Sequence, residues 1–128
     1  MYIMTESSSK KGKTTMQLMH EAEYLNREAN ELLYTGKGEN ALDLFNKAID
    51  INPVYATTWH NKANCLDELG RHSEAVECYN KAIEIDPYHA ETWYNKGISL
   101  KKMGRVKEAD QCIDCAVKLA LGIEEHIR

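Results

Sequence analysis

The sequence has little of what marks a membrane, exported or nucleic-acid-binding protein. Its 128 residues contain no apolar run of transmembrane length, and the start MYIMTESSSKKGKTT has an apolar run of only four residues, too short for a signal peptide. Sixteen basic against twenty acidic residues give a net charge of −4, without the basic excess of a nucleic-acid binder. The sequence predicts a cytoplasmic protein that binds neither membrane nor nucleic acid.

Groups that bind metals or carry catalysis are also scarce. Cys112 and Cys115 form the single C-x-x-C pair, and neither a second such pair nor an H-x-x-x-H pair completes a four-ligand zinc site. No nucleophile is accompanied by a base and an orienting group. We therefore expect no enzyme activity, no metal and no cofactor. The four cysteines are interpreted as reduced thiols, with Cys112 packed in the core and Cys115 partly exposed.

What the sequence does contain is an internal repeat at one constant offset. Trp59 returns as Trp93, and Pro53 returns as Pro87. Four further positions occur three times at the same offset: Leu32, Leu66 and Leu100; Gly36, Gly70 and Gly104; Ala41, Ala75 and Ala109; Ala48, Ala82 and Ala116. Such a period is typical of stacked supersecondary units that bury their apolar faces against one another.

Each unit has the apolar spacing of two helices. In the first unit, three- and four-residue spacing predicts a helix from about Thr14 to Tyr34, and Thr14 with Gln17 matches a capping box. We expect Gly36 and Gly38 to end this helix.

A second helix is expected in the same unit, from about Glu39 to Ile51, with Pro53 stopping it. The middle and last units repeat this plan, and no strand pattern competes with it. The sequence therefore predicts an all-α fold of six helices in three antiparallel pairs.

The chain is predicted to form one domain with short ends. Residues 1–13 have too little apolar area to pack, so we expect a flexible N-terminal tail. The repeat domain spans residues 14–121, with repeats at about 22–55, 56–89 and 90–121. Residues 122–128 form a C-terminal tail or a short helical extension.

This pattern resembles the tetratricopeptide repeat, a helix-turn-helix unit with the same period. In the middle unit the positions that carry the resemblance are Trp59, Ala63, Gly70, Ala75, Tyr79, Ala82 and Pro87. The third unit has the family's glycine as Gly97, and the resemblance covers residues 22 to about 121. It implies an α-solenoid, a right-handed superhelix of three helix pairs, whose first helices line a concave groove for a protein or peptide segment.

The same resemblance assigns residues of the first helices to the groove. They are Glu23, Asn26, Arg27, Asn30 and Leu33, then Thr57, His60, Asn61, Asn64 and Asp67, then Glu91, Tyr94, Asn95, Ile98 and Lys101. Asparagine both donates and accepts hydrogen bonds, so Asn30, Asn61, Asn64 and Asn95 suit the backbone of an extended peptide. In the groove, His60 could make binding mildly pH-sensitive near its ordinary pKa of about 6.5; the alternative is an ordinary polar residue of the surface.

Some relatives of this family hold the C-terminal carboxylate of heat-shock chaperones with lysines, an arginine and asparagines. Here Asn30 and Asn61 keep the asparagine positions, whereas the basic positions are occupied by Asn26, Glu91 and Asn95. A carboxylate would lose its charged partners and meet Glu91, so we do not expect this binding mode. The function that we favour is a scaffold or adaptor that binds an extended peptide or a helix of another protein in the concave groove.

The alternative is a structural unit that self-associates. Solenoids usually need a polar cap on the last repeat, and here only GIEEHIR follows the last apolar helix. Ile113, Val117 and Leu121 are then expected to be partly exposed. Either residues 122–128 cover this patch as a helix, or the patch pairs with a second copy to make a homodimer; we favour pairing.

Overall fold

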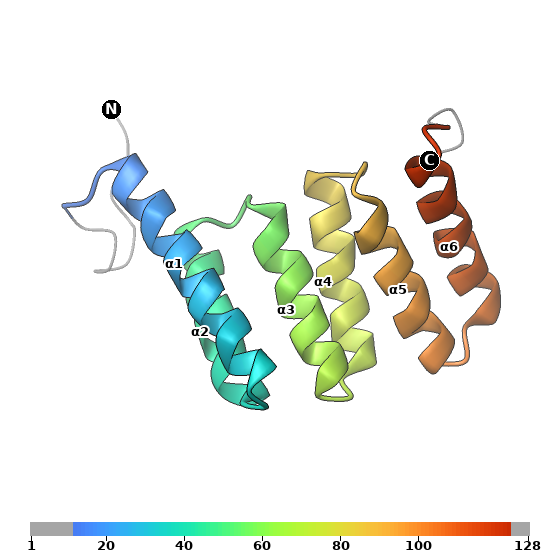
Figure 1. Ribbon diagram of the computed structural model, residues 1–128, viewed down its shortest axis with the longest axis horizontal. Helices are drawn as coiled ribbons and strands as arrows, with labels where there is room; N and C mark the ends of the chain where they lie inside the picture. Colours follow the sequence, from blue (N-terminus) through green and yellow to red (C-terminus); the bar gives the residue numbers. More distant parts are fainter. Residues whose placement is uncertain (1–11, 124–128) are drawn as a thin grey trace.

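A computed structural model of the chain describes residues 12–123, and within that range it contains six α-helices and no strand. The helices are α1 (Thr15–Tyr34), α2 (Gly38–Ile51), α3 (Ala56–Glu68), α4 (His72–Ile85), α5 (Ala90–Lys102) and α6 (Val106–Ala120). Along the long axis of the molecule they follow the order of the chain, from α1 and α2 at one end, where α1 lies in front of α2 in this view, to α6 at the other end (Figure 1).

The helices stack as three antiparallel pairs, α1 with α2, α3 with α4 and α5 with α6. Consecutive pairs are joined by packing of α2 against α3 and of α4 against α5. The prediction of an all-α solenoid is therefore confirmed. None of the helices in residues 12–123 combines the length and the apolar character needed to cross a bilayer.

Three glycines close the first helix of each pair by the same backbone geometry. Gly36, Gly70 and Gly104 have φ angles of 83°, 80° and 81°, in the left-handed region that favours glycine. The amide of the residue after each glycine donates to the carbonyl of Leu32, Leu66 or Leu100, at 2.8, 2.8 and 2.9 Å. These Schellman-type turns explain why the glycine recurs with the repeat.

Gly38 differs from the expectation that it ends α1, because it is the first residue of α2. It is buried, and a Cβ atom there would lie 2.9 Å from Cδ2 of Leu69. The glycine therefore allows close approach of two repeats, and the chain reverses at Gly36 alone.

The tryptophan of one repeat is tied to the proline that ends the preceding one. Nε1 of Trp59 donates to the carbonyl of Pro53 at 2.7 Å, and Nε1 of Trp93 donates to that of Pro87 at 2.8 Å. Each bond spans the turn into the next helix pair. The bond recurs with the period because it fixes where the following repeat begins.

Large rings alternate with alanines in the core. Phe45 and Tyr79 are the largest fully enclosed side chains; Leu66 is buried in the same cluster, and Leu100 is buried in a second cluster with Val76. The alanines that let the helices approach this closely are fully buried: Ala29, Ala41, Ala63, Ala75 and Ala109. This rigid stack sets the positions of the side chains on the faces of α1, α3 and α5.

The two ends of the described range close differently. Thr14 caps α1 as expected, because its hydroxyl accepts from the amide of Gln17 and Oε1 of Gln17 accepts from the amide of Thr14. At the other end, α6 stops at Ala120 and Gly122 has φ 80°. The expectations for residues 1–11 and 124–128 lie outside the described residues, and the domain boundaries remain predictions.

Candidate functional site

A cavity lies across the first helices of the three pairs. It has a volume of about 640 Å³ and is open to solvent. Its lining comes from α1, α3 and α5, with one residue from α4: Leu33, Tyr34, Asn64, Asp67, Glu68, Tyr79, Asn95, Ile98 and Lys102. We call this cavity the groove. It occupies the face that the sequence assigned to a partner.

The predicted binding residues divide into three groups in the structure. Asn64, Asn95 and Ile98 line the groove and are half-buried. Arg27, Asn30, Tyr94 and Lys101 are exposed on the same helices, and Asn61 is half-buried. Asn26 and His60 are only 8% and 7% exposed, so the fold largely encloses both side chains.

The asparagines join the first helices to one another. Nδ2 of Asn61 donates to Oδ1 of Asn26 at 3.2 Å, and Nδ2 of Asn95 donates to Oδ1 of Asn64 at 3.3 Å. The hydroxyl of Tyr79 also donates to Oδ1 of Asn64. The side-chain carbonyl of Asn64 thus accepts two hydrogen bonds, which fix the plane of its amide and the direction of its Nδ2.

Four groove residues were not predicted as binding residues: Tyr34, Glu68, Tyr79 and Lys102. Tyr34, Glu68 and Lys102 are equivalent positions of successive repeats, and each directly follows a residue assigned to the groove in the sequence. That regularity could have identified these three residues as groove residues from the sequence. Tyr79 gave no such signal, because its ring is core and only its hydroxyl reaches Asn64.

Charges of both signs meet at the C-terminal ends of α3 and α5. Asp67 contacts Nδ1 of His72, and its Oδ2 lies 3.6 Å from Nζ of Lys102. The Asp67 side chain is 14% exposed, whereas that of Lys102 is 50% exposed. Asp67 is therefore a fixed carboxylate in the groove wall, and Lys102 is its more exposed partner.

His60 lies in a different environment from the open groove face that the sequence suggested. Its Nδ1 and Nδ1 of His89 both lie 2.8 Å from Oγ1 of Thr92. The His60 ring packs edge-on against Tyr79, with centroids 5.8 Å apart. These histidines line a separate cavity of about 70 Å³, and burial lowers the pKa of His60.

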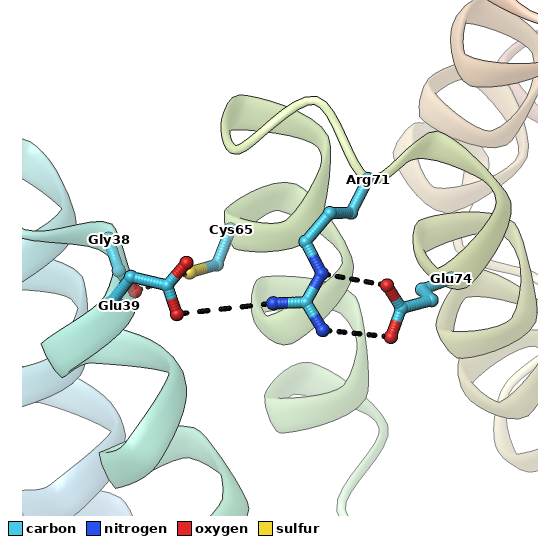
Figure 2. Close-up of polar contacts among 5 residues, drawn as sticks. All are labelled: Gly38, Glu39, Cys65, Arg71 and Glu74. Atoms are coloured by element: carbon cyan, nitrogen blue, oxygen red, sulfur yellow. Dashed lines mark hydrogen bonds and ion pairs between the residues drawn. The ribbon is translucent and has the colours of Figure 1, made fainter.

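An arginine on the turn before α4 joins the first two repeats (Figure 2). Arg71 donates to both carboxylate oxygens of Glu74, at 2.7 and 2.9 Å, and its Nη1 lies 4.0 Å from Glu39 on α2. Beside it, Sγ of Cys65 donates to the carbonyl of Gly38 at 3.2 Å. The bidentate bond from Arg71 lowers the pKa of Glu74. The pair of Arg71 with Glu39 and the bond from Cys65 to Gly38 join the second repeat to α2, and Glu74 and Glu39 occupy the guanidinium group of Arg71.

The C-x-x-C pair is explained by packing. Cys112 is 6% exposed and packs with Val76, Leu100 and Ala109, as expected, and Cys115 is half-buried. Burial raises the pKa of both thiols, which favours the neutral form. In the part of the chain that the structure describes, no group of three or more His, Cys, Asp or Glu residues is arranged to hold a metal ion.

The face of α6 and the turn after it expose apolar side chains. Val117 and Leu121 are 49% and 69% exposed, and Ile113 is half-buried between α5 and α6. Val117 and Leu121 are thus accessible in the described part of the chain.

Comparison with protein families gives one consistent result. Three models, each described as a tetratricopeptide repeat, match residues 22–55, 56–89 and 78–111. Among curated proteins, an uncharacterized protein of Methanocaldococcus jannaschii is 47% identical over 45 residues, 35% of this chain and 52% of that protein. The chain thus matches about half the length of that relative.

Solved structures share the architecture at low sequence identity. A crystal structure of MamA has a TM-score of 0.77 at 23% identity, covering 84% of this chain and 63% of MamA. The first tetratricopeptide domain of Spaghetti (RPAP3), bound to the HSP90 peptide SRMEEVD, has a TM-score of 0.78 at 19% identity, covering 84% and 86%. The second such domain, bound to the same peptide, has a TM-score of 0.77 at 21% identity, covering 80% and 95%. At these identities the likeness shows the fold.

Proposed function

Because the chain belongs to the tetratricopeptide repeat family, we propose that it is a protein-interaction module that holds an extended peptide segment of another protein in its groove. The two Spaghetti domains that share its fold are bound to a peptide. A partner segment lying across α1, α3 and α5 accounts for a groove that all three repeats line. We assign the module no chemistry of its own.

The fixed amide of Asn64 is the observation that carries this proposal. Asn95 and Tyr79 both donate to its Oδ1, so Nδ2 of Asn64 is oriented before any ligand arrives. Oδ1 of Asn95 and the exposed side-chain amide of Asn30 add further hydrogen-bonding groups on the same helices' faces. Oriented donors and acceptors suit a peptide backbone because little side-chain entropy is lost on binding.

Selection from a library of short random peptides tests this function. The wild-type domain is expected to retain peptides that then bind in solution. Asn95→Ala and Asn30→Ala should each weaken that binding by about three- to tenfold, the effect of losing one or two hydrogen bonds. The matched control is Asn80→Ala, an exposed asparagine of α4 outside the groove lining. Retention of no peptide, or equal loss in the control, would overturn the proposal.

Self-association through α6 is the second candidate, supported by the exposure of Val117 and Leu121. It predicts a sedimentation coefficient that rises with protein concentration. Val117→Glu should abolish the rise, because a charge would be buried in the contact. A wild-type protein that stays monomeric at high concentration removes this candidate and leaves the peptide function unaffected.

A further inference from the structure

The chemistry of the groove rim changes from one repeat to the next. The last two residues of α1 are Leu33 and Tyr34, those of α3 are Asp67 and Glu68, and those of α5 are Lys101 and Lys102. These pairs are equivalent positions of the three repeats, so they occupy the same place on successive helices. The rim therefore runs from apolar and aromatic, through acidic, to basic.

The acidic pair presents one enclosed and one open carboxylate. Asp67 is held by His72 and by Lys102, whose Nζ is 3.6 Å away and whose side chain is half exposed. Glu68 is exposed, and within residues 12–123 no cationic group lies within ion-pair distance of it. The negative charge at the end of α3 is thus only partly neutralised by the protein itself.

An aromatic ring completes this part of the groove. Tyr34 lines the same cavity as Asp67 and Glu68 and is 96% exposed, the highest value among the exposed large hydrophobic residues. The face of a tyrosine ring attracts a cation, and it also covers the methylene groups of a long side chain. An aromatic ring and two carboxylates that line one cavity are the features that bind a guanidinium or an ammonium group.

We propose that the groove binds a peptide segment through an arginine or lysine side chain seated between Tyr34 and the carboxylates of Asp67 and Glu68. This inference rests on the proposed function, since it names the side chain that such a segment supplies. The incoming cation displaces Nζ of Lys102 from Asp67. Arginine binds better than lysine, because its planar group pairs with a carboxylate through two bonds and stacks on an aromatic ring.

An acidic side chain would be repelled at this place in the groove. Such a group would face Asp67 and Glu68, and Lys102 would have to leave Asp67 to reach it. Peptides that carry acidic residues and no basic residue are therefore expected to bind weakly here.

The peptides retained in the selection described above provide the test. Wild-type protein should enrich arginine and, less strongly, lysine at one position. In a retained peptide, changing that residue to glutamine should weaken binding by about three- to tenfold, and added sodium chloride should reduce the difference. Glu68→Gln and Asp67→Asn should reproduce that loss. Lys102→Gln should strengthen binding, because it removes the competing cation.

Matched variants separate the site from overall charge. Glu77→Gln and Lys81→Gln make the same charge changes at exposed positions of α4 outside the groove lining, and both should leave affinity unchanged. Because Glu68 is exposed, Glu68→Gln keeps the test decisive even where Asp67→Asn perturbs folding. Peptides retained without basic enrichment would overturn this inference and leave the proposed function standing. Failure to retain any peptide would overturn both.

Discussion

The imidazole rings of His60 and His89 meet at a single hydroxyl group. Their centroids lie 5.5 Å apart, and each Nδ1 is 2.8 Å from Oγ1 of Thr92. One hydroxyl hydrogen can be donated to only one of the two nitrogens, so the other ring must donate its own N–H to the oxygen. If both rings take up a second proton, both Nδ1 atoms can only donate to Oγ1 of Thr92, and two positively charged rings face each other.

Acid should therefore weaken the junction of the second and third repeats. Burial lowers the pKa of His60 below its ordinary 6.5, His89 lowers it further, and Glu91 opposes the shift. Tyr79 and Asp86 are the other titratable groups at this histidine pair. Because the pKa of His60 is lower in the folded protein, the unfolded chain binds a proton at this histidine more readily. The contribution of His60 to the free energy of unfolding is therefore greatest above about pH 6.5, and it falls as the pH drops, by at most about 1.4 kcal/mol per pH unit.

Urea unfolding between about pH 7 and pH 5 measures this effect. His60→Gln should flatten the dependence, because glutamine keeps a partner for Thr92 without titrating in that range. The control His20→Gln changes an exposed histidine of α1 and should leave the wild-type slope. An unchanged slope in His60→Gln would show that other groups cause the pH dependence.

Gly97→Ala should destabilise the third repeat. A Cβ atom at this position would lie 2.7 Å from Cγ1 of Ile113 and 3.1 Å from the carbonyl oxygen of Ala109. Alanine favours a helix over glycine by about 1 kcal/mol, but the overlap costs more, so we expect a net loss of about 1 to 2 kcal/mol. Chemical unfolding followed by circular dichroism gives the value.

The control is Ser73→Ala, at an exposed position of α4, which should change stability by less than about 0.5 kcal/mol. A Gly97→Ala protein as stable as wild type would contradict the close packing of α5 and α6.

Tyr79→Phe should change peptide binding more than stability. The hydroxyl donates to Oδ1 of Asn64, which also accepts from Asn95, so its removal leaves no orphaned acceptor. We expect a stability loss of about 0.5 to 1 kcal/mol. Peptide affinity should fall because the amide of Asn64 is less firmly oriented, and titration with a retained peptide measures it. Tyr24→Phe, on the exposed face of α1, is the control for losing a hydroxyl. Unaltered affinity in Tyr79→Phe would mean that the orientation of Asn64 does not matter for binding.

Thr14→Ala should loosen one end of the stack locally. The reciprocal bonds between Thr14 and Gln17 satisfy backbone groups at the start of α1, where Met16 and Met19 are 63% and 46% exposed. Since that turn packs little, the loss of about 1 kcal/mol should appear as faster amide exchange at residues 15–18, with the unfolding midpoint nearly unchanged. A comparable rise in exchange in α5 would indicate that the cap stabilises the whole array.

Much of the backbone follows from single residues that recur at the period. Gly36, Gly70 and Gly104 mark the turns because a positive φ angle is needed there, and Pro53 and Pro87 mark the ends of the second helices. The prediction for Gly38 was wrong for a physical reason. Gly38 is needed because a larger residue would collide with Leu69. The sequence alone does not distinguish a glycine needed for its small size from one needed for a positive φ angle.

The sequence by itself determined the helices and their pairing, because these depend on the repeat period and on local turn chemistry. The tertiary structure alone decided which polar groups of different repeats meet. Asn26 bonds Asn61 at a separation of 35 residues, and Asn64 bonds Asn95 at a separation of 31. Neither separation equals the 34 residues from Trp59 to Trp93. The repeat period gives equivalent residues equivalent surroundings. Which residues touch each other depends instead on the angle and the axial shift at which neighbouring helices pack.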